Sequence, residues 1–497
     1  MNNQQTDVLN AVINDLKTGT KGSYTVNANP GTGKTYLTVE VANAAANLGY
    51  RVGIFPFGRD ATAEVSERLG KNPLITVSTS HSEGKRWLGR VRVDDNDNLL
   101  QLYLKGQGVY NQNVLKLINL CKANLVTNED ELMVVVNRHK LEFKDATVYG
   151  IVLNALQIND PKWVTFEDMI RLPVIKNKLK PIYDLVILDE YQDQSYAQVQ
   201  MSQKLTKGVL LCVGQDLQAI YGFRGGLFQV IPGTITKTLN LTYRFGKTIA
   251  DYINDVFDTD IVPAIDKVGA VTFDQIDLGQ VDDSHMIIAR TNAELIPYAV
   301  KLLTLGKKVN LTNRDLLQDM IRLLYNAHIE TCPHCQSELI TRRNKKPYGD
   351  PYYLACGNWP DCKGTIVYNY DYLTSGEALI KIKAVLAERR LSQDVDNQAV
   401  TDDTLQIFEY LLNTFDVKTA ISKLNQLTQA TSGAVLTTAH KSKGLQANIV
   451  HVLQNGFDAC KTRAIKNNDT YQAEQEHNLW FVALTRAITQ LNIVPKA

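Results

Sequence analysis

A glycine-containing turn between a short apolar strand and a helix constrains the fold of this chain most strongly. The strand is expected over residues 24–27, the turn over residues 28–35 and the helix over residues 36–48. Gly31 and Gly33 let the turn point its backbone N–H groups inward, and a helix N-terminus behind such a turn attracts anions. The pattern predicts a phosphate-binding cradle in a parallel α/β sheet.

Four side chains have the chemistry that phosphoryl transfer needs. Lys34 is placed to reach the β- and γ-phosphates of a nucleotide, and the Thr35 hydroxyl is placed to hold Mg²⁺. A buried strand is expected over residues 185–188, and its carboxyl end delivers Asp189 and Glu190. Asp189 is expected to help hold the metal, and Glu190 to orient or deprotonate the attacking water. An acidic strand end that only faces solvent is the alternative interpretation.

Length and composition allow several structural units and indicate no extensive polyanion-binding surface. The chain has 497 residues, of which 44% are hydrophobic, and a formal net charge of only +1. A nucleic-acid site would therefore have to be a local groove with basic and aromatic groups. No segment resembles a signal peptide, and no apolar run approaches the roughly 20 residues that span a bilayer. These features predict a soluble, cytoplasmic protein.

Four of the seven cysteines are spaced as in zinc-binding modules. Cys332 and Cys335 form a tight pair, and Cys356 and Cys362 form a wider one. Two such pairs can offer four thiolates in a tetrahedron, which suits structural Zn²⁺ with no open coordination position. His334 is an alternative ligand, and unrelated reduced thiols are the alternative interpretation of the whole cluster.

The wider cysteine pair and the residues around it resemble the zinc ribbons at the carboxyl ends of type IA topoisomerases, which bind single-stranded DNA. Basic and aromatic side chains near the cysteines favour such a contact. They are Arg342, Arg343, Lys345, Lys346, Tyr352, Tyr353 and Trp359. A ribbon that only stabilises an insertion, or that binds a partner protein, is the alternative.

Seven further segments, together with the cradle, occur in the order found in one known family. They are residues 57–69, 79–82, 213–226, 239–244, 287–292, 437–445 and 481–487. The chain resembles superfamily 1 DNA helicases of the UvrD/Rep family over most of its length. The resemblance implies two RecA-like domains that bind ATP in the cleft between them.

The resemblance also implies roles around the nucleotide. Gln5 would read the adenine edge, and Gln218 would report hydrolysis from beside the γ-phosphate. Arg244 and Arg486 would neutralise the γ-phosphate in the transition state, because a cradle and Mg²⁺ alone leave its charge incompletely compensated.

Two departures from the family pattern affect the nucleotide pocket. Tyr36 replaces the usual arginine after the cradle threonine, so an aromatic sandwich with Tyr243 is expected around adenine. Gln446 replaces a glutamate. Its amide oxygen can still accept a hydrogen bond from a ribose hydroxyl, but this bond lacks the charge of a carboxylate acceptor. Weaker discrimination between ribose and deoxyribose is expected.

Aromatic side chains are expected to hold a single strand of DNA, because π-faces grip bases without sequence preference. Stacking is expected from Phe57, Tyr221 and Phe223, phosphate or base contacts from Arg224 and His440, and further contacts from Thr79 and His81. Core packing is the alternative for the aromatic residues, and a structural role is the alternative for His81.

The resemblance, the cysteines and the amphipathic segments predict an α/β chain of two RecA-like P-loop domains with parallel sheets, with one helical insertion and one zinc-ribbon insertion. The first motor domain is expected to comprise residues 1–82 and 180–245, with an accessory domain inserted at residues 83–179. The second is expected to comprise residues 246–328 and 372–497, with the ribbon at residues 329–371.

The sequence therefore predicts an ATP- and Mg²⁺-dependent helicase and translocase on single-stranded DNA, with 3′ to 5′ movement implied by the resemblance alone. Expected ligands and partners are ATP, Mg²⁺, structural Zn²⁺, single-stranded DNA, duplex junctions, and unidentified replication or repair proteins. The alternatives are a translocase that strips proteins with little unwinding, and a nucleic-acid-binding scaffold switched by nucleotide. A nuclease is not indicated, because no second carboxylate cluster suits paired metals.

Overall fold

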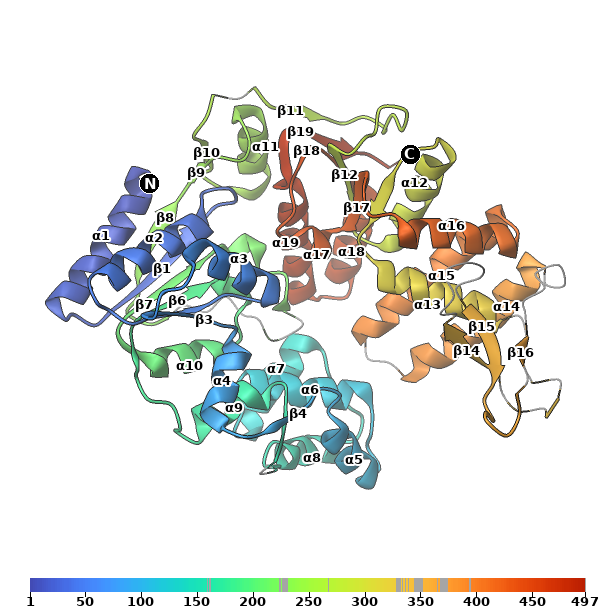
Figure 1. Cartoon of the computed structure of the whole chain (residues 1–497), viewed down its shortest axis with the longest axis horizontal. Helices are drawn as coiled ribbons and strands as arrows, with labels where there is room; N and C mark the ends of the chain where they lie inside the picture. The colour runs from blue at the N-terminus through green and yellow to red at the C-terminus, as the bar shows by residue number, and fades with distance from the viewer. Residues whose placement is uncertain are drawn as a thin grey trace. The chain divides into compact units, whose positions relative to one another are not determined.

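The computed structural model divides by its contacts into two compact units. It describes residues 1–158, 160, 162–222, 225, 231–266, 268–327, 332, 334–335, 337, 339–343, 352–363, 365–366, 374–392 and 395–496. The first unit comprises Met1–Val271 and Cys460–Thr489, and the second comprises Thr272–Ala459 and Gln490–Ala497. Figure 1 labels the elements of both.

A six-stranded parallel sheet forms the centre of the first unit, in the order β3-β2-β6-β7-β1-β8. The strands are β1 (Gly22–Ala28), β2 (Val52–Phe55), β3 (Ile75–Val77), β6 (Tyr183–Asp189), β7 (Thr206–Gly214) and β8 (Ile235–Leu239). Asn27 of β1 pairs with Gly214, and Asp189 of β6 pairs with Val213. The carboxyl ends of these three strands therefore lie side by side, as the sequence predicts.

Helices cover both faces of this sheet. They include α1 (Asn3–Thr18), α2 (Lys34–Asn47), α3 (Arg59–Leu69), α9 (Asp168–Ile175) and α10 (Tyr196–Leu205). Successive side chains of β6 alternate between two cores, because strand residues point to opposite faces. Ile187 packs with residues of α1 and α2, whereas Leu188 packs with residues of α9 and α10.

The expected helical insertion has a hydrophobic core of its own. Its elements are α4 (Ser80–Leu88), β4 (Arg92–Asp94), α5 (Asn98–Gly106), α6 (Gln112–Ala123), α7 (Glu129–His139), α8 (Thr147–Ala155) and β5 (Trp163–Thr165). Helices α5 to α8 gather together in Figure 1. A buried ion pair joins α6 to α9, which also lies in the range expected for the insertion, because Lys122 Nζ lies 2.6 Å from Asp168 Oδ2.

Two segments group with the first unit although the sequence places them in the second motor domain. They contain α11 (Lys247–Phe257) and most of α18 (Gln454–Lys466) and α19 (Thr470–Leu484). Phe257 and Phe481 hold α11 against α19, with ring centroids 5.0 Å apart. Short elements complete this unit: η1 (Tyr191–Asp193), η2 (Asp216–Gln218), β9 (Leu241–Thr242) and β10 (Val262–Pro263).

Another six-stranded sheet, most of which belongs to the second unit, has the order β11-β19-β18-β12-β17-β13. The strands are β11 (Ala270–Thr272), β12 (His285–Ala289), β13 (Val309–Leu311), β17 (Ala434–Thr438), β18 (Ala447–Leu453) and β19 (Ala487–Val494). Strands β18, β12, β17 and β13 pair in parallel. The predicted α/β class with two parallel sheets is therefore confirmed.

In the described part of the second unit, two helices contact this sheet, three others pack on helices of the unit, and one short helix follows β17. They are α12 (Asn292–Thr304), α13 (Arg314–Asn326), α14 (Ser375–Ser392), α15 (Val395–Thr414), α16 (Val417–Gln429) and α17 (Ala439–Ser442). Strands β14 (Leu339–Arg343), β15 (Tyr352–Cys356) and β16 (Thr365–Ile366) form a small antiparallel sheet beside α13. Within the described ranges, no helix is both long enough and apolar enough for a membrane crossing.

Candidate functional site

The glycine turn forms a tight loop between β1 and α2. Gly31 and Gly33 have φ angles of 77° and 79°, a region that residues with a Cβ atom avoid. A Cβ atom on Gly31 would lie 2.6 Å from Arg244 Cβ and 2.6 Å from Thr242 Oγ1. Tyr243 N donates a hydrogen bond to Gly31 O at 2.9 Å. The loop is therefore held against the segment after β8, which brings Arg244 beside the cradle.

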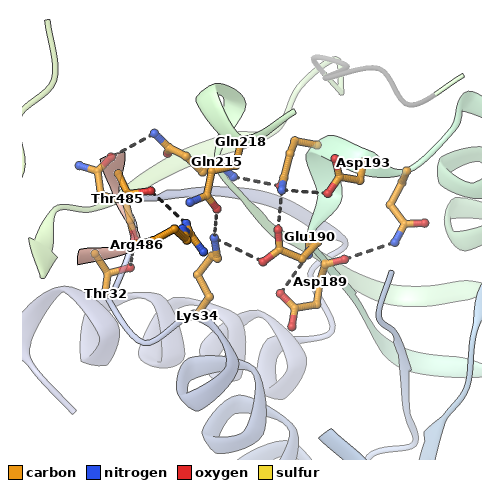
Figure 2. A network of polar contacts seen from close by, with 12 residues as sticks. Thr32, Lys34, Asp189, Glu190, Asp193, Gln215, Gln218, Thr485 and Arg486 are labelled. Carbon is orange, nitrogen blue, oxygen red and sulfur yellow. Dashed lines mark hydrogen bonds and ion pairs between the residues drawn. The ribbon is translucent and has the colours of Figure 1, made fainter. Parts of the chain in front are cut away.

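Lys34 contacts side chains from two neighbouring strand ends. Its Nζ donates a hydrogen bond to Gln218 Oε1 at 2.9 Å and lies 3.4 Å from Glu190 Oε1. Figure 2 shows the ammonium group between these two partners. Glu190 directly follows β6, and Gln218 ends η2, which follows β7. The parallel sheet thus brings together three residues that the sequence assigns to one site.

Asp189 is buried at the end of β6, where it is 4% exposed. Its Oδ1 accepts a hydrogen bond from Glu190 N at 2.9 Å. Burial, and then the adjacent Glu190 carboxylate, raise the pKa of Asp189 to about 7, whereas Lys34 opposes the rise. Two adjacent carboxyl groups beside one ammonium are a donor set that suits a hard cation such as Mg²⁺. Thr35, the other expected ligand, lies half-buried in the first turn of α2.

A chain of amide side chains holds these strand ends in place. Gln192 donates to a Glu190 carboxylate oxygen, and its own Oε1 accepts from Gln215 N at 3.0 Å. Gln215 Nε2 then donates to Asn29 Oδ1 at 3.1 Å. Glu190 has a φ of 49°, a left-handed conformation that costs roughly 1–2 kcal/mol for a residue with a Cβ atom. The amide contacts therefore hold the Glu190 carboxylate in a strained but defined position.

Both predicted arginines lie in the first unit, near Glu190. Arg244 Nη1 donates to Thr485 O at 2.8 Å, and Arg486 Nε donates to Val482 O at 2.8 Å. Burial lowers the pKa of Arg244 to about 10, and Glu190 opposes this change. Burial, and then the nearby Arg244 charge, lower the pKa of Arg486. Two buried guanidinium groups beside the cradle are suited to compensate the negative charge of a phosphate group.

Three residues are expected at adenine: Gln5, Tyr36 and Tyr243. Gln5 is 3% exposed; its Nε2 donates to Thr32 O at 2.9 Å and its Oε1 accepts from Asn2 N at 3.0 Å. The amide therefore supports the cradle and caps α1 in this structure. Tyr36 and Tyr243 are 41% and 47% exposed. The aromatic sandwich around adenine stays a prediction.

Two of the expected DNA-stacking residues contact each other. The rings of Phe57 and Tyr221 stack with centroids 5.3 Å apart and an interplanar angle of 27°. Phe57 follows β2, whereas Tyr221 lies three residues after Gln218. Phe223 and Arg224 lie outside the described residues. One short segment thus carries both a partner of Lys34 and a ring of the aromatic pair.

Thr79 and His81 have structural roles that the sequence does not separate from DNA contact. Thr79 caps α4, because its Oγ1 accepts a hydrogen bond from Ser82 N at 3.2 Å. The His81 ring stacks on Phe166 with centroids 3.8 Å apart, and burial lowers the pKa of His81 to about 4. His81 is therefore neutral near pH 7, and the outer ring of this stack is Phe166, which is 44% exposed.

Helix α19 contacts the segment that contains Gln218 and Tyr221. Asn478 Nδ2 donates to Ala219 O at 3.0 Å, and Gln475 Nε2 donates to the same carbonyl at 3.2 Å. A Cβ atom on Gly222 would lie only 1.8 Å from the hydroxyl of Tyr471. Sequence analysis missed these contacts, although a buried Asn478 in an apolar helix is a signal for a specific polar partner.

Two expected site residues belong to the second unit. His440 lies half-buried in α17, and Gln446 is exposed just before β18.

The four cysteines converge into one cluster. The sulfur atoms of Cys332, Cys335, Cys356 and Cys362 all lie within 4.8 Å of one another. Cys332 and Cys356 are fully buried and belong to the same hydrophobic core as α13. Convergence of four sulfur atoms fits a closed, tetrahedral structural metal site.

Known proteins support this description of the nucleotide site. A family model described as an AAA domain matches residues 11–224. These residues include the glycine turn, Lys34, Glu190 and Gln218. Together with the parallel sheet, the glycine turn and Lys34 have the arrangement of a phosphate-binding loop, as in P-loop proteins.

Three proteins that the chain resembles are named as DNA helicases. The chain is 24% identical over 330 residues to F-box DNA helicase protein 1 of Schizosaccharomyces pombe. The matched stretch covers 62% of this chain and 33% of that protein. It is 27% identical over 299 residues to ATP-dependent DNA helicase PcrA of Staphylococcus aureus, and that match covers 50% of this chain and 40% of PcrA. It is also 27% identical over 293 residues to ATP-dependent DNA helicase UvrD1 of Mycobacterium leprae, and that match covers 46% of this chain and 36% of UvrD1.

These matches confirm the resemblance to superfamily 1 helicases of the UvrD/Rep family. The matched stretches cover at most 40% of the length of these relatives.

Proposed function

We propose that this protein is an ATP-dependent DNA helicase and single-stranded DNA translocase that moves 3′ to 5′. The observation that carries the proposal is the convergence of Lys34, Glu190 and two buried arginines beside a glycine cradle. The relatives named as ATP-dependent DNA helicases support the choice of ATP and DNA. The direction of movement rests on the family resemblance.

The residues of the first unit would divide the chemistry as follows. Thr35 and Asp189 would hold Mg²⁺, which supplies charge neutralisation at the phosphates. Lys34 would exchange its contacts with Glu190 and Gln218 for phosphate oxygens. Release of Lys34 would leave the Glu190 carboxylate available to orient the attacking water or to accept its proton. Arg244 and Arg486 would stabilise charge that develops in the transition state.

We further propose that the four cysteines hold structural Zn²⁺. Three protein ligands and a water are usual in catalytic zinc sites, whereas four thiolates leave no open position. The cluster therefore suits a stabilising metal and not a reactive one. Two of its cysteines are part of the core of the second unit, so the metal would contribute to the stability of that unit.

Coupling between DNA and the nucleotide site is expected to depend on Asn478. Asn478→Ala removes a hydrogen bond to Ala219 O, which fixes the segment between Gln218 and Tyr221. We expect stimulation of ATP turnover by single-stranded DNA to fall about three- to tenfold, since one hydrogen bond contributes roughly 1 kcal/mol. Basal turnover is expected to change less than twofold. Steady-state turnover with and without oligo(dT) measures both.

The matched control for this prediction is Glu474→Ala, because Glu474 is exposed on the same helix. Single-stranded DNA should stimulate ATP turnover by Glu474→Ala as strongly as turnover by the native chain. Equal stimulation in Asn478→Ala and the native chain would show that α19 does not transmit the effect of DNA.

Sugar selectivity is expected to be weak because Gln446 stands where the family has a glutamate. We expect the apparent affinities for ATP and dATP to differ by less than about threefold. Gln446→Glu should raise the preference for ATP roughly three- to tenfold, since bonds to charged acceptors are about twice as strong as neutral ones. Competition binding with ATP and dATP decides this, and a strong preference for ATP in the native chain contradicts it.

The test of the proposed function compares hydrolysis with strand separation. We expect ATP hydrolysis to rise with single-stranded DNA and a 3′-tailed duplex to be unwound faster than a 5′-tailed one. Hydrolysis and movement without unwinding would indicate a translocase that strips proteins. DNA binding that responds to nucleotide without hydrolysis would indicate a switched scaffold.

A further inference from the structure

Asp260 lies outside the motifs of the nucleotide site, but it contacts the glycine cradle. Its Oδ1 accepts a hydrogen bond from Asn29 Nδ2 at 3.2 Å, and its Oδ2 accepts one from Asn240 Nδ2 at 3.1 Å. Asn29 belongs to the glycine turn, and Asn240 lies between β8 and β9. One carboxylate therefore joins the cradle to the segment that leads to Arg244.

The loop that carries Asp260 is fixed by α11. Asn254 Oδ1 accepts hydrogen bonds from Thr259 Oγ1 at 2.8 Å and from Ile261 N at 2.9 Å. Asn254 Nδ2 also donates to Ile261 O at 2.9 Å. These bonds hold the residues on both sides of Asp260, so its carboxylate has a defined place although the residue is exposed.

The amides on both sides of Asp260 have assigned orientations, because an amide oxygen accepts hydrogen bonds and an amide nitrogen donates them. Asn240 N can only donate, and its partner is Gln4 Oε1 at 3.2 Å. Gln4 Nε2 therefore donates to Asn240 Oδ1 at 2.7 Å, which leaves Asn240 Nδ2 to face Asp260. An ionised carboxylate only accepts, so Asp260 likewise requires the NH₂ group of Asn29.

The orientation of Asn29 determines the contact on its other side. Because Asn29 Nδ2 faces Asp260, Asn29 Oδ1 is left to accept a hydrogen bond from Gln215 Nε2 at 3.1 Å. Asn29 is 5% exposed and Gln215 is 2% exposed, so this bond is shielded from solvent. Gln215 Oε1 is buried and has no hydrogen-bond partner among the described residues. Asn29 is therefore the partner that orients the Gln215 amide.

Gln215 carries the effect of this contact to Glu190, and both residues are labelled in Figure 2. Gln215 N donates to Gln192 Oε1 at 3.0 Å, and Gln192 Nε2 donates to a Glu190 carboxylate oxygen. Gln192 also packs closely on the end of β7, because a Cβ atom on Gly214 would collide with Gln192 Oε1. A shift of Gln215 would therefore move the amide that holds Glu190.

We propose that Asp260 is a positioning residue for ATP hydrolysis. Its carboxylate sets the orientation of the Asn29 amide, which holds Gln215 against the cradle. Gln192 then keeps Glu190 in the position that turnover needs. The proposal rests on the proposed function, because Glu190 is the residue expected to act on the attacking water.

A clamp that only stabilises the loop after α11 is the alternative role of Asp260. Such a clamp would affect the stability of the first unit, and its loss would combine independently with changes at the end of β7. A positioning role instead predicts that substitutions of Asp260 and Gln215 affect one and the same step. Kinetic coupling between two variants therefore separates the two roles.

The test measures ATP turnover by the whole chain with single-stranded DNA present. Asp260→Asn replaces one carboxylate oxygen with an NH₂ group, which would face the NH₂ group of Asn29 or of Asn240. We expect kcat to fall about tenfold, since a small displacement of a reacting group can lower the rate by up to roughly 100-fold. KM for ATP should change less than about twofold, because Asp260 is not expected to bind the nucleotide.

The second variant, Gln215→Ala, tests the route by which Asp260 acts. It keeps the backbone N–H group but removes Nε2, so it should lower kcat about as much as Asp260→Asn does. The double variant should be no slower than the slower single variant, because both changes break the same bridge. Multiplication of the two losses in the double variant would show that Asp260 acts independently of Gln215, which contradicts the proposal.

The control is Asp258→Asn, because Asp258 is an exposed carboxylate of the same loop. Its φ of 53° is left-handed, a conformation that asparagine also adopts, so the control should have native turnover. Native kcat in Asp260→Asn would overturn the proposal, and so would native kcat in Gln215→Ala, whatever the melting temperature of the Asp260 variant. No hydrolysis by the native chain with Mg²⁺ and single-stranded DNA would instead overturn the proposed function.

Discussion

Replacing Lys34 with alanine is expected to lower ATP turnover by about 10²- to 10³-fold, the usual effect of removing one electrostatic donor from a transition state. Lys34 Nζ lies 3.4 Å from Glu190 Oε1, beside the cradle. Its loss would also remove the ammonium group that is placed to contact the phosphates, which should weaken nucleotide binding. Steady-state hydrolysis and binding of a fluorescent ATP analogue measure the two effects.

The matched control for Lys34→Ala is Lys21→Ala, because Lys21 is exposed just before β1. The control should retain native turnover, which excludes an effect of net charge alone. Glu190→Gln keeps the size of the side chain and should also lose turnover while it still binds nucleotide. Native turnover in the Lys34 variant would show that the cradle is not the catalytic site.

Replacing Cys332 with serine is expected to abolish zinc binding and to destabilise the second unit by several kcal/mol. Structural zinc contributes roughly 10 kcal/mol or more to isolated zinc fingers at neutral pH. Cys332 and Cys356 are both 0% exposed in the core shared with α13, so loss of metal leaves polar sulfur ligands inside that core. Zinc content and thermal melting measure the effect.

Basal ATP turnover of Cys332→Ser is expected to be largely intact at 25 °C, because Lys34, Glu190 and both arginines belong to the first unit. Cys460→Ser is the control, since Cys460 lies outside the cluster and should not affect metal content. Loss of turnover together with the metal would show that the ribbon supports the motor fold. Unchanged zinc content would contradict the assignment of the cysteines.

Local sequence order was sufficient to predict the centre of the nucleotide site. Lys34 and Glu190 each follow an apolar strand closely, and parallel strands bring their carboxyl ends together. The place of Gln218 beside them was implied by the family resemblance. The cysteine cluster could be predicted for a similar reason, because short spacing within each pair limits where the sulfur atoms can lie.

Other features depend on contacts between segments far apart in the chain, which no local pattern reveals. The motif at residues 481–487 does not show that Phe481 packs on Phe257 in the first unit. The partner of Gln5 is a backbone carbonyl of the cradle, which a side-chain motif cannot indicate. Likewise, the stacking of His81 on Phe166 joins residues that are far apart in the sequence, so no local pattern shows it.

The most direct test of the central claim is ATP hydrolysis by the whole chain, measured with and without single-stranded DNA in the native protein and in Arg486→Ala. The account predicts DNA-stimulated turnover in the native protein and a loss of about 10³-fold or more in the variant, the usual effect of removing a transition-state arginine. Native-like, DNA-stimulated turnover in Arg486→Ala, or no hydrolysis by the native protein with Mg²⁺ and DNA present, would contradict it.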